Sequence, residues 1–289
     1  MRTVRQRRKY KDPATCKKIG REKINGFDLV IYGYLKMQNK DNVTKIIAIT
    51  NPQGCIGKTA TAVNLSIALA QKGKSVLVVD SDPAGRIALN FGITIQNLRG
   101  TLNDVYHVNQ KVEDCIVQGT FPNVDVLPSD ISLAEAEIML SKQEGREYLL
   151  KEHLNRIKDK YDYIMIDCPS SLSLLTVNAM VASDSILIPM QCDEFALERI
   201  NKHIQIICQL NEKLGTSVLF GGILLTMFEE DKSIWFVNQI RSELKQKCFN
   251  TVIPRDRKLA ESLYEGIPLV NYDSNCPSFM AFENLADEL

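Results

Sequence analysis

The sequence predicts an α/β fold in which a mostly parallel β-sheet is covered by helices on both faces. From Lys45 onward, short apolar runs rich in β-branched residues alternate with longer segments of helical period. Strands that alternate with helices form parallel sheets, because a parallel pair needs a long crossover connection. The runs are apolar at successive positions, which is typical of strands buried on both faces. A chain of 289 residues with 45% hydrophobic residues can build the core that such a sheet needs.

The first 36 residues differ in composition from the rest. They hold eleven Lys and Arg against three Asp and Glu, a net charge of +8, so residues 37–289 sum to −8 in a chain that is neutral overall. We predict a basic, disordered N-terminal extension at residues 1–36, within which residues 27–36 could form a short strand or an anchoring turn. The extension is either a DNA-binding tail or a segment without a role ahead of a working start at Met37. Residues 37–289 are predicted to form one domain, too acidic to bind polyanions in general.

The first strand–helix unit carries the clearest motif. The β-branched run 46–50 is too short for a stable helix and is predicted to be a strand. A turn at residues 51–57 contains Pro52, Gly54 and Gly57, and a helix is predicted from Lys58 to near Gly73. Strand, Gly-rich turn, Gly-Lys-Thr and helix are the layout of a phosphate-binding P-loop. The backbone N–H groups of the turn and of the helix start would face anionic oxygens.

This motif predicts binding of ATP with Mg²⁺. Lys58 would place a positive charge on the β- and γ-phosphates, and Thr59 would place a hydroxyl on the metal. The pattern is incomplete, because Pro52 stands where the first Gly is expected. The alternative is a chance Gly-Lys-Thr at a strand–helix turn. The residues predicted to bind the cofactor through the loop are Gln53, Gly54, Cys55, Ile56, Gly57, Lys58, Thr59 and Ala60.

The later elements follow in the same way. The runs VLVV, YIMI and ILIPM are short, apolar and bounded by polar or turn residues, as buried strands are. We predict strands at residues 75–80, 124–127, 163–167, 185–190, 217–225 and 251–254, and helices at residues 133–158, 195–214 and 233–247. No apolar run reaches the ~18 residues of a membrane span, and the N-terminus lacks the layout of a secretory signal.

Carboxylates stand where predicted strands end. Asp80 and Asp82 follow one apolar strand, and Asp167 ends another. The carboxyl ends of parallel strands line the ligand crevice of such a sheet. A nucleotide with its metal needs a carboxylate near Mg²⁺ and a group that orients the attacking water. We predict that Asp167 serves the metal and that Asp82 orients the water and lies near the metal. The alternative is that these residues only cap strand ends.

The eight cysteines show no CxxC and no metal-ligand spacing, and several lie in apolar runs. We interpret them as buried, reduced thiols, which indicates a cytosolic compartment. The three histidines show no partner pattern and are interpreted as ordinary surface or core residues.

Six sequence blocks between Lys45 and Glu283 resemble the ParA-type partitioning ATPases, in the ParA/MinD group of deviant-Walker P-loop proteins. They stand in that family's order and spacing: IIAITNPQGCIGKTATAVNLS, VLVVDSDPAG, YDYIMIDCPSSLSLLTVNAM, ILIPMQCDEFALE, GILLTM and NTVIPRDRKLAESLYEGIPLV. The resemblance implies the P-loop NTPase fold and makes residues 37–289 an ATPase domain. Residues 1–44 are too short for the helix-turn-helix domain of the long members, so the chain looks like the short form.

The resemblance also implies an ATP-driven switch. Such proteins bind ATP, pair into a homodimer, and then bind double-stranded DNA without sequence preference. A centromere-bound, ParB-like partner protein stimulates hydrolysis and releases them. They are cytoplasmic and nucleoid-associated, without stable membrane association. Carried over, Lys58 and Asp82 would be catalytic, Thr59, Asp82 and Asp167 would serve the metal, and Pro254 and Arg255 would lie near the adenine.

Two departures from the family pattern affect turnover. The family loop begins Lys-Gly-Gly, and its Lys reaches across the dimer to the partner's nucleotide, whereas this chain has Gln53-Gly54-Cys55. Gln53 carries no charge to meet the negative charge of the transition state. Cys55 places a side chain where the backbone should approach phosphate closely. We expect ATP binding to survive and dimer-dependent hydrolysis to be weak.

The DNA-binding surface is also altered. Where the family carries Arg-Thr-Asn, this chain reads Glu229-Glu230-Asp231-Lys232-Ser233. The compensating candidates for DNA binding are Arg241, Lys245, Lys247, Arg255, Arg257 and Lys258, which could equally form a solvated helix face and loop. The pair Trp235-Phe236 is either a partner contact or part of the core.

Three functions therefore compete. The first is a DNA-partitioning ATPase of a plasmid, chromosome or mobile element. The second is a membrane-surface ATPase like MinD, which needs a basic amphipathic C-terminal helix, whereas residues 281–289 are acidic. The third is a nucleotide-binding regulator that has lost turnover, which Gln53 and Cys55 keep open. An iron–sulfur reductase is disfavoured, because no Cys-Gly-Gly stands beside the matched strands.

Overall fold

The computed structural model describes residues 43–94, 96, 98–107, 110–193, 195–244 and 247–289. The predicted extension at residues 1–36, the possible strand at residues 27–36, and Lys245 lie outside the described residues. These expectations therefore stay predictions.

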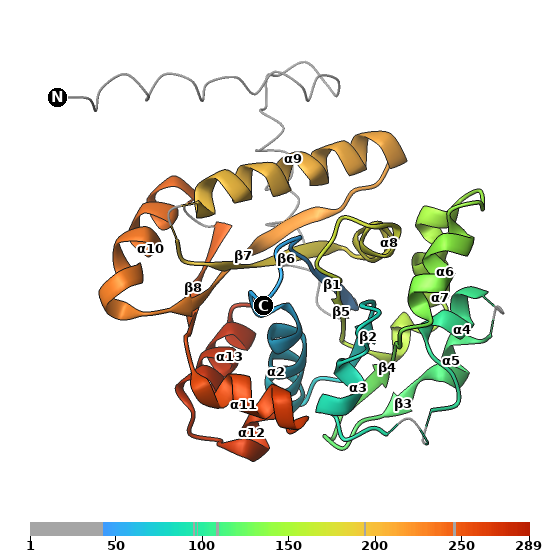
Figure 1. Cartoon of the computed structure of the whole chain (residues 1–289), viewed down its shortest axis with the longest axis horizontal. Helices are drawn as coiled ribbons and strands as arrows, with labels where there is room; N and C mark the ends of the chain where they lie inside the picture. Colours follow the sequence, from blue (N-terminus) through green and yellow to red (C-terminus); the bar gives the residue numbers. More distant parts are fainter. Residues whose placement is uncertain (1–42, 95, 97, 108–109, 194, 245–246) are drawn as a thin grey trace.

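An eight-stranded sheet forms the centre of the molecule, in the order β3-β4-β2-β5-β1-β6-β7-β8 (Figure 1). Its pairs are parallel except for β3 with β4. This arrangement confirms the predicted fold class, with a short antiparallel edge strand that was not predicted. The strands are β1 (Lys45–Ile49), β2 (Val76–Asp80), β3 (Val117–Gln118), β4 (Val124–Leu127), β5 (Tyr163–Asp167), β6 (Ser185–Gln191), β7 (Leu219–Phe228) and β8 (Cys248–Pro254).

Successive residues of each central strand face opposite sides of the sheet. In β1, Ile46 and Ala48 belong to one buried cluster, while Ile47 and Ile49 belong to the other. The same alternation in β5 explains why these runs are apolar throughout, since side chains point to alternate faces and both faces are covered.

Helices cover both faces (Figure 1). The buried cluster that contains Ile46 and Ala48, which we call the first cluster, is covered by helices. These are α4 (Leu102–His107), α5 (Val112–Cys115), α6 (Leu133–Leu140), α7 (Leu149–Leu154), α8 (Leu174–Ala182), α9 (Ala196–Leu214) and α10 (Glu230–Leu244). The second is closed by α2 (Lys58–Gln71), α3 (Ile87–Asn90), α11 (Arg257–Glu265), α12 (Leu269–Tyr272) and α13 (Pro277–Asp287). No helix in the described ranges is both long and apolar enough to cross a membrane.

The register of the central strands brings the predicted site together. Ile49 at the end of β1 pairs with Asp167 at the end of β5, and Asp80 at the end of β2 pairs with Asp167 on its other side. The turn after β1 and both strand-end carboxylates therefore meet at one edge of the sheet.

Several predicted elements differ from the structure. The helical region expected at residues 133–158 is present but is divided into α6, η2 (Arg146–Tyr148), α7 and η3 (Lys158–Lys160). The break contains Gly145 with φ of 71°, a conformation that ends a helix. Helices α8, α11 and α13 were not predicted.

The prediction of buried, reduced thiols holds for part of the described chain. All seven described cysteines are free; five are buried, Cys208 is half-buried and Cys55 is exposed. Trp235 is 63% exposed, so the core interpretation is wrong for it, and its ring meets Phe236 edge to face.

Candidate functional site

The loop between β1 and α2 is anchored by polar side chains on both sides. Asn51 is fully buried; its Nδ2 donates to the Pro189 carbonyl on β6 at 2.8 Å, and its Oδ1 accepts from the Gln53 N–H at 2.9 Å. Thr226 on β7 donates from Oγ1 to the Ile56 carbonyl at 3.0 Å. These bonds fix the loop against two neighbouring strands, so its backbone N–H groups have a defined direction.

Two loop residues adopt left-handed backbone conformations. Gly57 has φ of 91° and directly precedes α2, and Cys55 has φ of 57°. Gly takes this conformation without steric cost, whereas a residue with a Cβ does not. The loop geometry therefore requires Gly57, and it places at Cys55 a backbone that Gly would adopt more readily.

Lys58 is a buried cation at the start of α2. It is 6% exposed, and its Nζ donates to the Gln53 carbonyl at 2.9 Å and to Ser170 Oγ at 2.8 Å. Burial lowers the pKa of Lys58, while the fields of Asp167 and Asp82 act in the opposite direction. The ammonium group thus lies between the loop and the strand-end carboxylates, where it would meet the phosphates of a nucleotide.

Asp167 and Thr59 form the second half of the site. Thr59 Oγ1 donates to Asp167 Oδ2 at 2.7 Å. Asp167 is 1% exposed, and its Oδ1 is buried without a hydrogen-bond partner among the described residues. Burial raises the pKa of Asp167 well above its ordinary value, and the neighbouring Asp80 raises it further.

An unpartnered buried carboxylate oxygen beside a hydroxyl fits a hard divalent cation, because Mg²⁺ prefers oxygen ligands and takes few of them from the protein. In the described part of the chain, no group of three or more His, Cys, Asp or Glu is placed to hold a metal alone. Mg²⁺ would therefore be held by Thr59 and Asp167 together with phosphate oxygens and water. Thr59 and Asp167 therefore fit a metal that is held together with a nucleotide.

Asp80 and Asp82 have different roles in the structure. Fully buried Asp80 accepts from the Asp82 N–H at 3.1 Å and from the Ile87 N–H at 3.0 Å. Burial raises the pKa of Asp80 to about 7. Half-buried Asp82 accepts from the Ala84 N–H at 2.9 Å, and its carbonyl accepts from Ser129 Oγ at 2.5 Å. Asp80 thus braces the turn that presents Asp82, whose field reaches Lys58.

The predicted adenine residues lie at the same edge of the sheet, farther from the loop. Pro254 ends β8 beside Phe228 of β7, and the Arg255 N–H donates to the Phe228 carbonyl at 2.9 Å. The Arg255 guanidinium pairs with Glu229 at 2.8 Å. Pro254 and Arg255 are therefore placed at the carboxyl ends of strands, while Arg255 is also the ion-pair partner of the acidic segment at residues 229–231.

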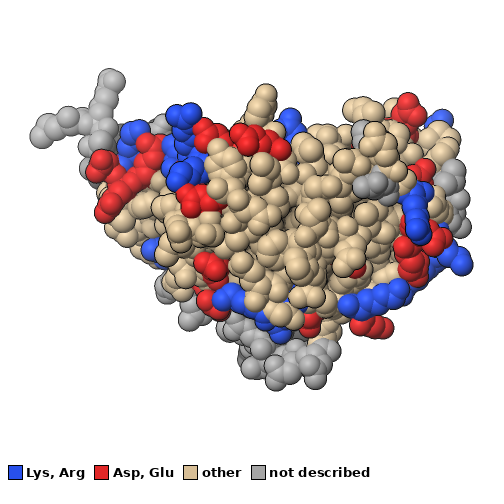
Figure 2. Space-filling model, turned by 90° about the horizontal axis from the view of Figure 1, so that it is seen from below, with Lys and Arg blue, Asp and Glu red and all other residues tan. Residues whose placement is uncertain are grey.

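Three of the described candidates for DNA binding are held in contacts within the domain. Arg241 donates to the Asn250 carbonyl and so ties α10 to β8. Arg257 pairs with Glu261, and Lys258 pairs with Asp273. Lys247 is half-buried beside β8. On the face shown in Figure 2, Lys and Arg lie next to Asp and Glu around the rim rather than forming a basic surface.

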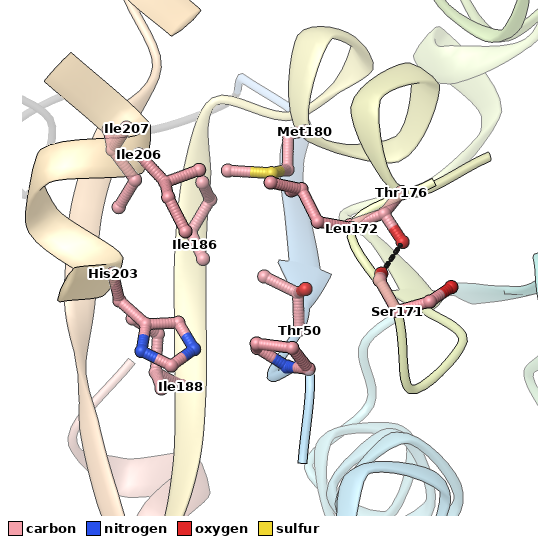
Figure 3. Close-up of a pocket in the computed structure, with 11 residues that line it drawn as sticks. Thr50, Ser171, Leu172, Thr176, Met180, Ile186, Ile188, His203, Ile206 and Ile207 are labelled. Carbon is pink, nitrogen blue, oxygen red and sulfur yellow. Dashed lines mark hydrogen bonds between the residues drawn. The ribbon is translucent and has the colours of Figure 1, made fainter. Parts of the chain in front are cut away.

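A small apolar cleft lies beside the loop, between α8 and α9 (Figure 3). Thr50, Leu172, Ile188 and Ile207 are among its lining residues. His203 also lines it; its Nδ1 lies 2.7 Å from the Arg199 carbonyl, and its Nε2 is buried without a partner among the described residues. Burial lowers the pKa of His203. The cleft borders the candidate site and is not part of it.

Sequence reasoning missed Asn51 and Ser170. Asn51 stands at the carboxyl end of β1, and Ser170 stands three residues beyond Asp167. Both are polar residues within three positions of the end of a central strand, a signal that was used only for the aspartates.

Comparison with known proteins gives consistent matches. The family described as an AAA domain matches residues 44–219. The chain is 40% identical over 247 residues to the sporulation initiation inhibitor protein Soj of Bacillus subtilis, covering 85% of this chain and 98% of Soj. It is 36% identical to the chromosome partitioning protein ParA of Caulobacter vibrioides, covering 86% of this chain and 94% of ParA.

Among solved structures, the septum site-determining protein MinD of Pyrococcus horikoshii, complexed with Mg-ADP, is similar to this chain with a TM-score of 0.71. The identity is 29%, and the match covers 85% of this chain and 96% of MinD. The similarity extends across nearly the whole of each of these proteins.

Proposed function

The chain belongs to the ParA/MinD-type partitioning ATPases, and we propose that it is a nucleotide-switched ATPase that segregates DNA of a plasmid, a chromosome or a mobile element. The observation that carries this proposal is the pairing of Thr59 with Asp167 beside the buried ammonium of Lys58. ATPase activity in general follows from the family. The cargo and the details of the switch are our proposal.

Each residue has a proposed task at this site. ATP supplies the transferable phosphoryl group, and Mg²⁺ neutralises its charge. The loop from Gln53 to Ala60 binds the phosphates through backbone N–H groups, and Lys58 adds its charge. Thr59 and Asp167 hold the metal, Asp82 orients the attacking water, and Asp80 holds the turn that positions Asp82. Pro254 and Arg255 border the adenine.

We further propose that ATP binding drives homodimer formation, and that the dimer binds double-stranded DNA without sequence preference. A ParB-like partner on the centromere site would stimulate hydrolysis, and the protein would act in the cytoplasm at the nucleoid. Support comes from the relatives named for chromosome partitioning. Arg257 is the leading candidate for phosphate contact, since its side chain is 90% exposed. Lys258 and Lys247 are weaker candidates, and Lys245 lies outside the described residues. Arg241 is assigned to the stability of the domain rather than to DNA, because its guanidinium bonds the Asn250 carbonyl.

The test is binding to a random-sequence DNA duplex with ATP, with ADP and without nucleotide. It uses the full chain and a version that starts at Met37. Binding of both versions with ATP alone would support the switch and make residues 1–36 incidental. Binding of the full chain regardless of nucleotide, with no binding by the short version, would identify the basic extension as the DNA contact. The partitioning proposal would then give way to the regulator.

A nucleotide-binding regulator with weak turnover is the second candidate, and Gln53 and Cys55 are the observations that favour it. A membrane-surface role like that of MinD has less support. The apolar side chains of α13, including Phe279, Phe282 and Leu285, pack into the second core cluster. They are therefore used inside the domain rather than offered to a lipid surface. Pelleting with liposomes in the presence of ATP tests this alternative.

A further inference from the structure

Ser170 holds the P-loop lysine from a loop on the other side of the site. Lys58 Nζ donates to Ser170 Oγ at 2.8 Å and to the Gln53 carbonyl at 2.9 Å. Ser170 lies between β5 and α8, and a Cβ placed on Gly54 would stand 3.8 Å from its Oγ. The two loops are therefore in contact, and the lysine joins them.

The number of donors on Lys58 limits what it can bind. An ammonium group has three N–H donors. One is directed to the Gln53 carbonyl, which belongs to the loop itself, and one to Ser170, which leaves one for a ligand. A nucleoside diphosphate needs one donor for its β-phosphate. A triphosphate, whose β- and γ-phosphates both engage the P-loop lysine, needs two.

We propose that Ser170 is a positioning residue that distinguishes nucleoside triphosphate from diphosphate. The bond between Lys58 and Ser170 is kept with a diphosphate and is broken by a triphosphate. The inference rests on the nucleotide binding proposed above and is independent of DNA binding. Its structural consequence is local, because the next residues, Ser171 and Leu172, line the cleft in Figure 3. The third phosphate therefore frees the loop that borders this cleft.

The test compares affinities for ADP and for a non-hydrolysable ATP analogue, both with Mg²⁺, by calorimetry on the full chain. Ser170→Ala should tighten binding of the ATP analogue about threefold to tenfold, the value of one hydrogen bond. The same substitution should leave ADP affinity unchanged. It removes the bond between Lys58 and Ser170 from the nucleotide-free protein and from the ADP complex alike, so the two effects cancel. Ser170→Thr keeps a hydroxyl and should behave as the wild type.

Ser171→Ala is the matched control, since the exposed Ser171 accepts from Thr176 through its backbone carbonyl, which the substitution retains. Weaker binding of the ATP analogue by Ser170→Ala would overturn the inference and show that the hydroxyl contacts the nucleotide. An equal change for both nucleotides, or none, would also overturn it. If the wild type bound neither nucleotide, the proposed function would fail as well. If it bound both and Ser170→Ala left the ratio of the two affinities unchanged, only this inference would be wrong.

Discussion

Thr59 Oγ1 and Asp167 Oδ2 are joined by a hydrogen bond of 2.7 Å, although 108 residues separate them in the chain. The bond connects the first turn of α2 to the end of β5, and it pairs a hydroxyl with a carboxylate that has a second, unpartnered buried oxygen. Among the described residues, the Thr59 hydroxyl is the hydrogen-bond partner of the buried Asp167 carboxylate. The arrangement leads to the first prediction.

Thr59→Val should remove the Mg²⁺ dependence of nucleotide binding. The substitution keeps the shape of the side chain and removes the oxygen that would ligate the metal. The measurement is affinity for a non-hydrolysable ATP analogue with Mg²⁺ and with EDTA. Thr59→Ser is the control and should keep the dependence seen in the wild type. Retention of the full Mg²⁺ effect in Thr59→Val would exclude Thr59 as a ligand.

Gln53→Lys should raise ATP turnover at least tenfold. A cation at this position would stabilise the negative charge of phosphoryl transfer, and such groups contribute several kcal/mol in related sites. The bonds of Gln53 within the loop use its backbone N–H and carbonyl, so a new side chain leaves them intact. Steady-state hydrolysis is measured with and without DNA, with Gln53→Met as the uncharged control. The prediction is wrong if Gln53→Lys is no faster, or if the wild type already turns over like its relatives.

Gly57→Ala should destabilise the nucleotide-free protein by about 1 to 2 kcal/mol, the cost of placing a Cβ in the left-handed region. The added methyl meets Thr226 Cγ2 only at 3.8 Å, so the cost comes from the backbone at φ of 91° rather than from a clash. Gly54→Ala is the matched control. Gly54 is outside the left-handed region and has room, so its substitution should change stability by less than about 0.5 kcal/mol. Urea unfolding of both variants separates the two cases.

The contribution of Asp80 to the stability of the nucleotide-free protein should fall as pH rises toward 7. The pKa of this carboxyl is raised from its ordinary value of 3.8 to about 7. Because the pKa is raised on folding, the folded state binds more protons at Asp80 than the unfolded state does between these two pH values. The stabilisation is therefore present at low pH and is lost as pH rises between these two values.

The Asp80 contribution has a slope of at most about 1.4 kcal/mol per pH unit, the limit for one proton. Urea unfolding between pH 5 and pH 7 in EDTA measures it. Relative to Asp80→Asn, the wild type should lose stability as pH rises over this range, whatever the absolute stability of the variant. Identical slopes would mean that Asp80 is already ionised in the folded protein at pH 5.

Arg257→Ala should weaken DNA binding without loss of stability. Arg241→Ala should lower stability without weakening DNA binding. Arg257 is 90% exposed in its ion pair with Glu261, and an exposed helical pair of this kind contributes little to stability, because water screens the charges. Arg241 bonds the Asn250 carbonyl, and its loss should cost about 1 kcal/mol.

Two measurements check this pair of variants. Loss of one phosphate contact should lower the slope of log affinity against log salt by about 0.9. Urea midpoints report stability in parallel. Unchanged DNA binding by Arg257→Ala would remove this residue from the proposed DNA surface.

The fold class, the position of the P-loop and the strands that carry the carboxylates could all be predicted from the sequence. These features are local: apolar β-branched runs, Gly and Pro in turns, and a Lys-Thr pair at a helix start can each be recognised without knowledge of the partner. The helical region expected at residues 133–158 was recognised in the same way, but not its division, because helical period continues across the break that contains Gly145.

Which side chains come into contact depends on the tertiary structure. The strand order β2-β5-β1 places Asp167 between the ends of its neighbours, and no local pattern fixes that order. It also brings Ser170 to Lys58, makes Asp80 a brace for the turn of Asp82, and turns Arg241 onto β8. Ser170 and Lys58, for example, are 112 positions apart, so no local pattern in the sequence joins them. The choice of these contacts depends on burial and on the distances set by the packed sheet, which is why the sequence predicted the chemistry of the site but not its connections.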